Sequence, residues 1–177
     1  GRISPAMAIR LCRELEPYHP FFVEEPCLPE NVDTLVTIAR STTIPIATGE
    51  RLFTKWGFRE ILEKRAATII QPDVCLCGGL LEMKKIAAMA EAQYVMVAPH
   101  NPMGPLATVI NVHFAASTPN FLIQEAIERM DGFHAEIVTN PIRWEDGYIF
   151  PSDKPGLGVE LNEEVAEKHP CNDRLWD

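Results

Sequence analysis

The feature of this 177-residue chain that most constrains its fold is a repeat of short apolar segments, each ending in an ionisable residue. These terminal residues recur about every 25 residues. The repeat predicts one β-strand per unit, with a polar side chain at the carboxyl end of each strand. The segments are residues 21–25, 44–50, 68–73, 94–100 and 121–125, and they end in Glu24 or Glu25, Glu50, Asp73, His100 and Glu125.

Amphipathic stretches separate these segments. Apolar residues at helical spacing predict helices over residues 6–15, 30–41, 55–64, 81–92 and 105–116. Alternating strands and helices predict parallel βαβ units and therefore an α/β fold class. The nearly continuous apolar character of the strands suits a parallel sheet that is covered on both faces. Residues 131–155 show no clear period, and we interpret them as a long irregular crossing.

Composition narrows the classes of partner and compartment. A formal net charge of −9 and the lack of a basic run disfavour nucleic acid and anionic membranes as partners. The cysteines are odd in number and sparse, which favours free thiols and a cytoplasmic location over a disulfide framework. Cys75 and Cys77 lack a second ligand pair at zinc-finger spacing. The five cysteines are Cys12, Cys27, Cys75, Cys77 and Cys171.

The pair Glu24-Glu25, followed by proline, is either a solvated strand end or part of a site. The carboxyl ends of parallel strands share one face and neighbouring strands lie about 4.8 Å apart, so the terminal side chains could converge. Crowded carboxylates require a positive charge, and Mg²⁺ prefers oxygen ligands. His100 suits proton transfer, and Asp73 on the preceding strand would fix its tautomer. Such a set suits removal of a proton next to a carboxylate.

Several motifs together resemble the enolase superfamily, its mandelate racemase subgroup and, within it, the galactonate dehydratases. They are Phe22-Val23-Glu24-Glu25-Pro26, Ala47-Thr48-Gly49-Glu50-Arg51, Ile70-Gln71-Pro72-Asp73, Gly78-Gly79, Ala98-Pro99-His100 and Ile123-Gln124-Glu125. The resemblance implies that residues 1–130 form strands four to eight of a modified TIM barrel of the (β/α)7β type. Residues 131–177 would return towards an amino-terminal capping domain.

The resemblance also implies roles for the strand-end residues. Glu24 and Glu50 would bind Mg²⁺, and His100 would take the α proton with Asp73 as its dyad partner. Glu125 would hydrogen-bond the substrate carboxylate in its protonated form, which crowding and burial would favour. Glu25 would be a neighbour of the ligands. Arg51 either orients the site or forms an ordinary ion pair.

The activity implied is Mg²⁺-dependent dehydration of an acid sugar, a galactonate-like aldonate, to a 2-keto-3-deoxy acid. A 2-hydroxy-acid racemase and a non-catalytic barrel remnant are the alternatives. The third metal ligand of the family would precede Gly1, so we expect this segment to belong to a longer polypeptide or to be inactive alone. Leu76 stands near a usual histidine of galactonate dehydratases, which leaves the sugar acid open. The full-length protein is expected to bind a small-molecule substrate and to form a homo-oligomer.

Overall fold

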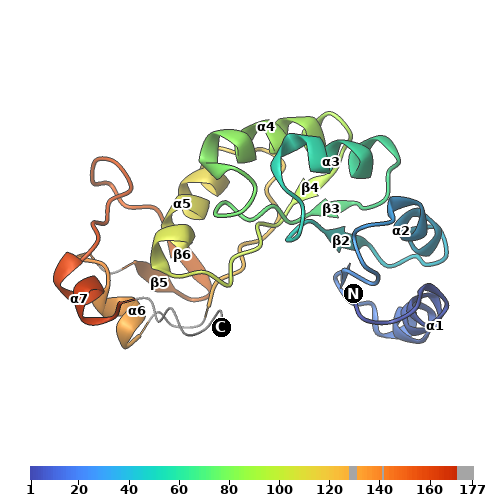
Figure 1. Cartoon of the computed structure of the whole chain (residues 1–177), viewed down its shortest axis with the longest axis horizontal. Helices are drawn as coiled ribbons and strands as arrows, with labels where there is room; N and C mark the ends of the chain where they lie inside the picture. The colour runs from blue at the N-terminus through green and yellow to red at the C-terminus, as the bar shows by residue number, and fades with distance from the viewer. Residues whose placement is uncertain (128–130, 141, 171–177) are drawn as a thin grey trace. The chain divides into compact units, whose positions relative to one another are not determined.

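The computed structural model describes residues 1–127, 131–140 and 142–170, and it divides into two units (Figure 1). Unit 1 contains Gly1–His100 and Ser117–Glu125, and unit 2 contains Asn101–Ala116 and the chain from Ala126 onwards. The predicted domain boundary after residue 130 stays a prediction. Cys171, predicted as a free thiol, lies outside the described residues.

Unit 1 is built on a parallel sheet whose strands follow one another in chain order. The strands are β1 (Val23–Glu24), β2 (Ile46–Thr48), β3 (Ile69–Ile70) and β4 (Met96–Val97). Their register pairs Glu24 with Ala47, Thr48 with Ile70, and Ile70 with Val97. Phe121 adds the fifth predicted segment as an isolated parallel bridge to Val97. The predicted α/β class with parallel strands is therefore confirmed, although the ladders are shorter than the apolar segments.

The α-helices of unit 1 precede the first strand or lie between strands, as predicted. They are α1 (Pro5–Leu15), α2 (Val32–Ala39), α3 (Thr54–Glu63) and α4 (Gly79–Glu91), with a short 3₁₀ helix at Glu16–Tyr18. Ser4 and Asn31 accept hydrogen bonds from backbone N–H groups in the first turns of α1 and α2, which satisfies donors that a helix start leaves unpaired. The apolar face of each helix is buried, and those of α3 and α4 contribute Phe58, Ile61, Leu62, Met83, Ile86, Ala87 and Ala90.

Glu82 on α4 holds the start of α3. Its Oε1 accepts from the backbone nitrogen of Lys55 at 3.0 Å and from Lys55 Nζ at 3.1 Å. Its Oε2 accepts from Lys85 Nζ at 3.2 Å. These bonds, first the one from the Lys55 backbone, lower the pKa of Glu82 from 4.5 to about 2. The carboxylate therefore stabilises the fold in its charged form.

We expect Glu82→Gln to weaken the fold mainly near neutral pH. Because the pKa of Glu82 is lower in the folded than in the unfolded state, its stabilisation is present above pH 4.5 and is lost as the pH falls towards 2. The free energy of unfolding, measured by urea titration at several pH values, should depend less on pH across that window in the variant. Glu63→Gln, which alters an exposed pair with Arg59, is the control. Equal acid sensitivity of the wild type and Glu82→Gln would contradict the prediction.

Unit 2 contains more regular structure than predicted. Its elements are α5 (Pro105–Ala116), α6 (Phe133–Glu136), the antiparallel pair β5 (Arg143–Glu145) and β6 (Tyr148–Phe150), and α7 (Glu163–Lys168). The prediction of an irregular crossing over residues 131–155 is wrong, because this range includes α6 and the hairpin. Asp146-Gly147, with φ angles of 50° and 81°, forms the hairpin turn, and an Asp-Gly pair between two strand segments is a known hairpin signal.

Of the residues that the structure describes, none belongs to a helix that is long and apolar enough to cross a membrane.

Candidate active site

His100 lies between two carboxylates at the carboxyl ends of neighbouring strands. Its Nδ1 is 2.8 Å from Asp73 Oδ2, and its Nε2 is 3.3 Å from Glu50 Oε2. The exposed fraction of the side chain rises from 1% for Asp73 to 15% for His100 and 33% for Glu50. Burial therefore decreases from Asp73 through His100 to Glu50. The structure thus brings together three of the predicted site residues.

The carboxylate of Asp73 is fixed by the chain that follows it. Its Oδ1 accepts from the backbone nitrogen of Cys75 at 2.7 Å, so both of its oxygens have partners. An ionised carboxylate can only accept, so the proton of the Asp73–His100 bond lies on Nδ1. Nε2 is then the nitrogen that can exchange a proton with another molecule.

The adjacent residues Glu24 and Glu25 have different environments. Glu25 is buried; its Oε2 accepts from both Nε and Nη2 of Arg51, and its Oε1 accepts from Thr48 Oγ1 at 3.2 Å. A left-handed φ of 41° at Glu25 turns the chain immediately after β1. Glu24 is exposed and accepts one hydrogen bond, from Gln71 Nε2 at 2.8 Å. Glu25 is thus neutralised by a guanidinium, whereas Glu24 keeps a charge that could bind a cation.

Arg51 pairs with Glu25 and not with its neighbour Glu50. We therefore expect Arg51→Met to destabilise unit 1. The substitution would leave the buried Glu25 carboxylate without its cation. Breaking a buried pair costs several kcal/mol, and because Arg51 is partly exposed we expect a loss of about 2 kcal/mol. Urea unfolding at pH 7 measures it.

Arg59→Met is the matched control, because Arg59 pairs with Glu63 at the surface with a nitrogen–oxygen distance of 3.5 Å. Its expected cost is below about 0.5 kcal/mol. If both variants lose the same stability, the buried pair does not contribute as described.

Glu125 follows the last strand segment of unit 1. Its segment runs parallel to β4, because Leu122 donates to the Val97 carbonyl at 2.8 Å, and so it leaves the sheet at the same end as His100. Glu125 is exposed, and the burial expected for it is wrong. Exposure follows from its place beyond the last bridge of the sheet, where no further strand covers it in the described chain.

The carboxylates of Glu24 and Glu50 are candidate ligands for a hard divalent cation. Glu24 ends β1 and Glu50 follows β2, and both offer carboxylate oxygens, the ligand type that Mg²⁺ prefers. No cationic side chain of the described residues pairs with Glu24. Within residues 1–127, 131–140 and 142–170, no group of three or more His, Cys, Asp or Glu side chains is arranged to hold a metal ion. Glu24 and Glu50 therefore fit such a site as two of its ligands.

The cysteines near the site are unsuited to nucleophilic or metal chemistry at neutral pH. Cys12, Cys27, Cys75 and Cys77 are free thiols. Burial, together with the charge of Asp73, raises the pKa of Cys75 and raises that of Cys77 to about 11. A thiol with a raised pKa carries little thiolate, the reactive form.

The sequence interpretation gave no role to Gln71, although the residue stands in one of the quoted motifs. It is buried directly after β3 and donates to Glu24. The signal was present in the sequence, because Gln71 is a polar residue within an otherwise apolar strand segment. Its partner could not be predicted without the order of the strands.

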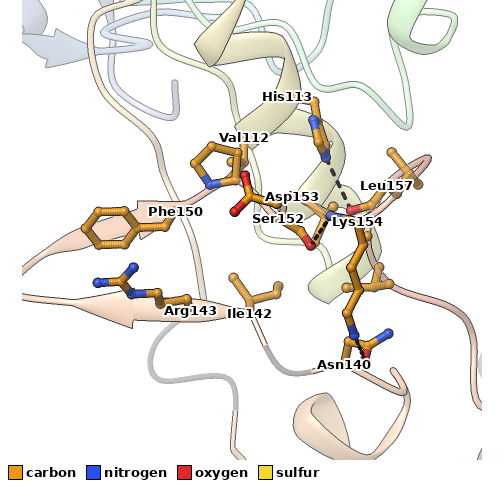
Figure 2. A pocket seen from close by; sticks show the side chains of 14 residues that line it. Val112, His113, Asn140, Ile142, Arg143, Phe150, Ser152, Asp153, Lys154 and Leu157 are labelled. Atoms are coloured by element: carbon orange, nitrogen blue, oxygen red, sulfur yellow. Dashed lines mark hydrogen bonds between the residues drawn. The ribbon is translucent and has the colours of Figure 1, made fainter.

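Unit 2 has a cavity of its own, of about 510 Å³ (Figure 2). His113 Nε2 lies 3.2 Å from the Leu157 carbonyl oxygen, and Lys154 Nζ donates to Asn140 Oδ1. Arg143 lies over the ring of Phe150, 4.2 Å from its centroid. These polar groups bind each other, and none of the predicted site residues lines the cavity. We therefore assign no catalytic site to it.

Comparisons with known proteins show the family of the chain. The family described as Enolase C-terminal domain-like matches residues 1–165. A D-galactonate dehydratase of Pectobacterium atrosepticum is 42% identical over 99% of this chain and 48% of that protein. A D-galactonate dehydratase of Ralstonia pickettii is 44% identical over 94% of this chain and 45% of that protein. The chain spans about half the length of these curated relatives.

Solved structures give the same result for the fold. A mandelate racemase/muconate lactonizing enzyme-like protein from Roseovarius sp. TM1035 superimposes with a TM-score of 0.91 and is 48% identical. The match covers 96% of this chain and 42% of that one. The described fold is therefore shared with these proteins over nearly the whole chain.

Proposed function

The chain belongs to the enolase C-terminal domain-like family, whose domain is the TIM-barrel part of these enzymes, and from that premise we propose that it is part of a Mg²⁺-dependent acid-sugar dehydratase. The substrate would be an aldonate of the galactonate type, as the names of its relatives suggest. The observation that carries the proposal is the contact of His100 with both Asp73 and Glu50.

His100 is the proposed base, with Nε2 as the accepting nitrogen. Asp73 accepts from Nδ1 and fixes the orientation of the ring, so Nε2 is the nitrogen that exchanges the proton. The base removes the proton on the carbon next to the substrate carboxylate. The hydroxyl on the following carbon then leaves as water after it gains a proton, and the enol becomes a 2-keto-3-deoxy acid. No oxidant or reductant is required.

Glu24 and Glu50 are the proposed protein ligands of Mg²⁺, and Glu125 is proposed to hydrogen-bond the substrate carboxylate. When bound, Mg²⁺ would stabilise the negative charge that develops on that carboxylate as the proton leaves. Glu25 and Arg51 bind each other and keep the turn after β1 against the turn after β2. Homo-oligomer formation stays a prediction.

The test uses the complete polypeptide encoded by the gene and a panel of aldonates with Mg²⁺. We expect release of a 2-keto acid from at least one aldonate, loss of turnover with a chelator and recovery when Mg²⁺ is restored. If the protein binds Mg²⁺ but turns over none of the aldonates, the dehydratase proposal is wrong. Exchange of the α proton with solvent without release of water would favour a racemase instead.

A further inference from the structure

We infer that Gln71 is a positioning residue that holds Glu24 in place for a cation, acting from β3 on a side chain of β1. The inference rests on the proposed function, in which Glu24 binds Mg²⁺. It goes further in assigning this task to a residue outside the ligand and acid–base set.

The hydrogen bond between these two residues crosses an intervening strand. Gln71 Nε2 is 2.8 Å from Glu24 Oε2, although β2 lies between β1 and β3 in the sheet. Strands that are two apart are separated by roughly 10 Å, so both side chains must extend towards each other. A long amide side chain at position 71 is therefore required for the contact.

The backbone around Gln71 brings it close to β2. Its N–H donates to the Thr48 carbonyl at 2.9 Å. Gly49, the residue after β2, has a φ of 148°, and a Cβ there would lie 2.7 Å from the Gln71 nitrogen. Only glycine fits this approach. Gly49 therefore allows the backbone after β2 to approach the backbone of Gln71 closely.

The chemistry of Gln71 is unfavourable for a residue that only fills the core. Its side chain is 5% exposed, and its Oε1 has no hydrogen-bond partner among the described residues. A buried polar atom without a partner destabilises a fold. The amide cannot be reversed, because Oε1 would then face the carboxylate of Glu24. An apolar residue would suit a purely structural role better.

The amide also leaves Glu24 able to bind a cation. Gln71 is neutral, so it fixes one carboxylate oxygen without cancelling the charge, in contrast to the action of Arg51 on Glu25. The described residues make no other hydrogen bond to the side chain of Glu24. Its Oε1 thus remains available while Oε2 is held. Residues that orient metal ligands in this way typically change metal affinity 10- to 100-fold when they are replaced.

The experiment measures Mn²⁺ binding by calorimetry on the complete polypeptide, because Mn²⁺ takes the same oxygen ligands as Mg²⁺. We expect Gln71→Leu to weaken binding about 10- to 100-fold without lowering the melting temperature, since the apolar side chain fills the buried volume. Gln71→Glu should weaken binding at least as much, because two carboxylates would then face each other. Gln93→Leu, at an exposed position, is the control.

A double variant separates positioning from a structural effect. In a Glu24→Gln background, Gln71→Leu should cause no further loss of affinity, because the residue through which it acts is already changed. Equal affinity of the wild type and Gln71→Leu, or an additive loss in the double variant, would overturn the inference and leave the proposed function standing. If the wild type binds neither Mn²⁺ nor Mg²⁺, both proposals are wrong.

Discussion

His100→Asn is expected to reduce exchange of the α proton of an aldonate substrate by about 10²- to 10⁴-fold, the range that a positioned base contributes. Asparagine has no nitrogen that accepts a proton near neutral pH, so the position of Nε2 beside Glu50 would hold no base. Metal affinity should change less than about twofold, because the proposed ligands are carboxylates. Exchange in D₂O, followed by proton NMR, measures the first quantity, and calorimetry measures the second.

His19→Asn is the matched control for this variant. His19 is exposed and has a left-handed φ of 49°, a conformation that asparagine adopts readily. We expect its exchange rate and its stability to equal those of the wild type. If His100→Asn retains exchange near the wild-type rate, the base must be another group.

Asp73→Asn is expected to lower kcat by about 10³- to 10⁴-fold while the fold is retained. The amide that replaces Oδ2 would donate to Nδ1 of His100, which places the ring proton on Nε2 and blocks proton removal there. The Asn oxygen can still accept from the backbone of Cys75, so the turn after β3 should persist.

The measurement is kcat and KM on the aldonate that the wild type turns over, with circular dichroism to confirm folding. Asp33→Asn serves as the control, because Asp33 is exposed and pairs with Lys64 at the surface. A small effect on kcat with a large effect on KM would assign Asp73 to substrate binding, contrary to its role as the orienting group. An unfolded variant would show that the carboxylate is needed mainly for the fold.

Much of the site could be predicted because strand direction alone determines it. Asp73, His100 and Glu50 follow neighbouring parallel strands, and the carboxyl ends of such strands meet. The spacing of the strand ends in the sequence was therefore enough to predict that these residues lie close together. The strand pattern left the choice between Glu24 and Glu25 open, and only the family resemblance made it. In the structure the difference rests on Arg51 reaching Glu25 and on the turn at Glu25.

The remaining features depend on information that a linear pattern does not contain. The bond of Gln71 to Glu24 requires the order of three strands and the close approach at Gly49. The exposure of Glu125 depends on where the sheet ends. The β5–β6 hairpin is different, because its Asp146-Gly147 turn is visible in the sequence and a local rule would have found it.

The two oxygens of Asp73 have separate tasks, since one accepts from the imidazole and the other from the backbone of Cys75. A descendant that lost its chemistry would therefore still benefit from an acceptor at this place, to keep the loop folded. The ring of His100 pairs with Asp73 and Glu50, and no hydrogen bond from it to a backbone group occurs among the described residues. His100 is therefore more informative than Asp73 for distinguishing active enzymes from homologues that have lost the activity.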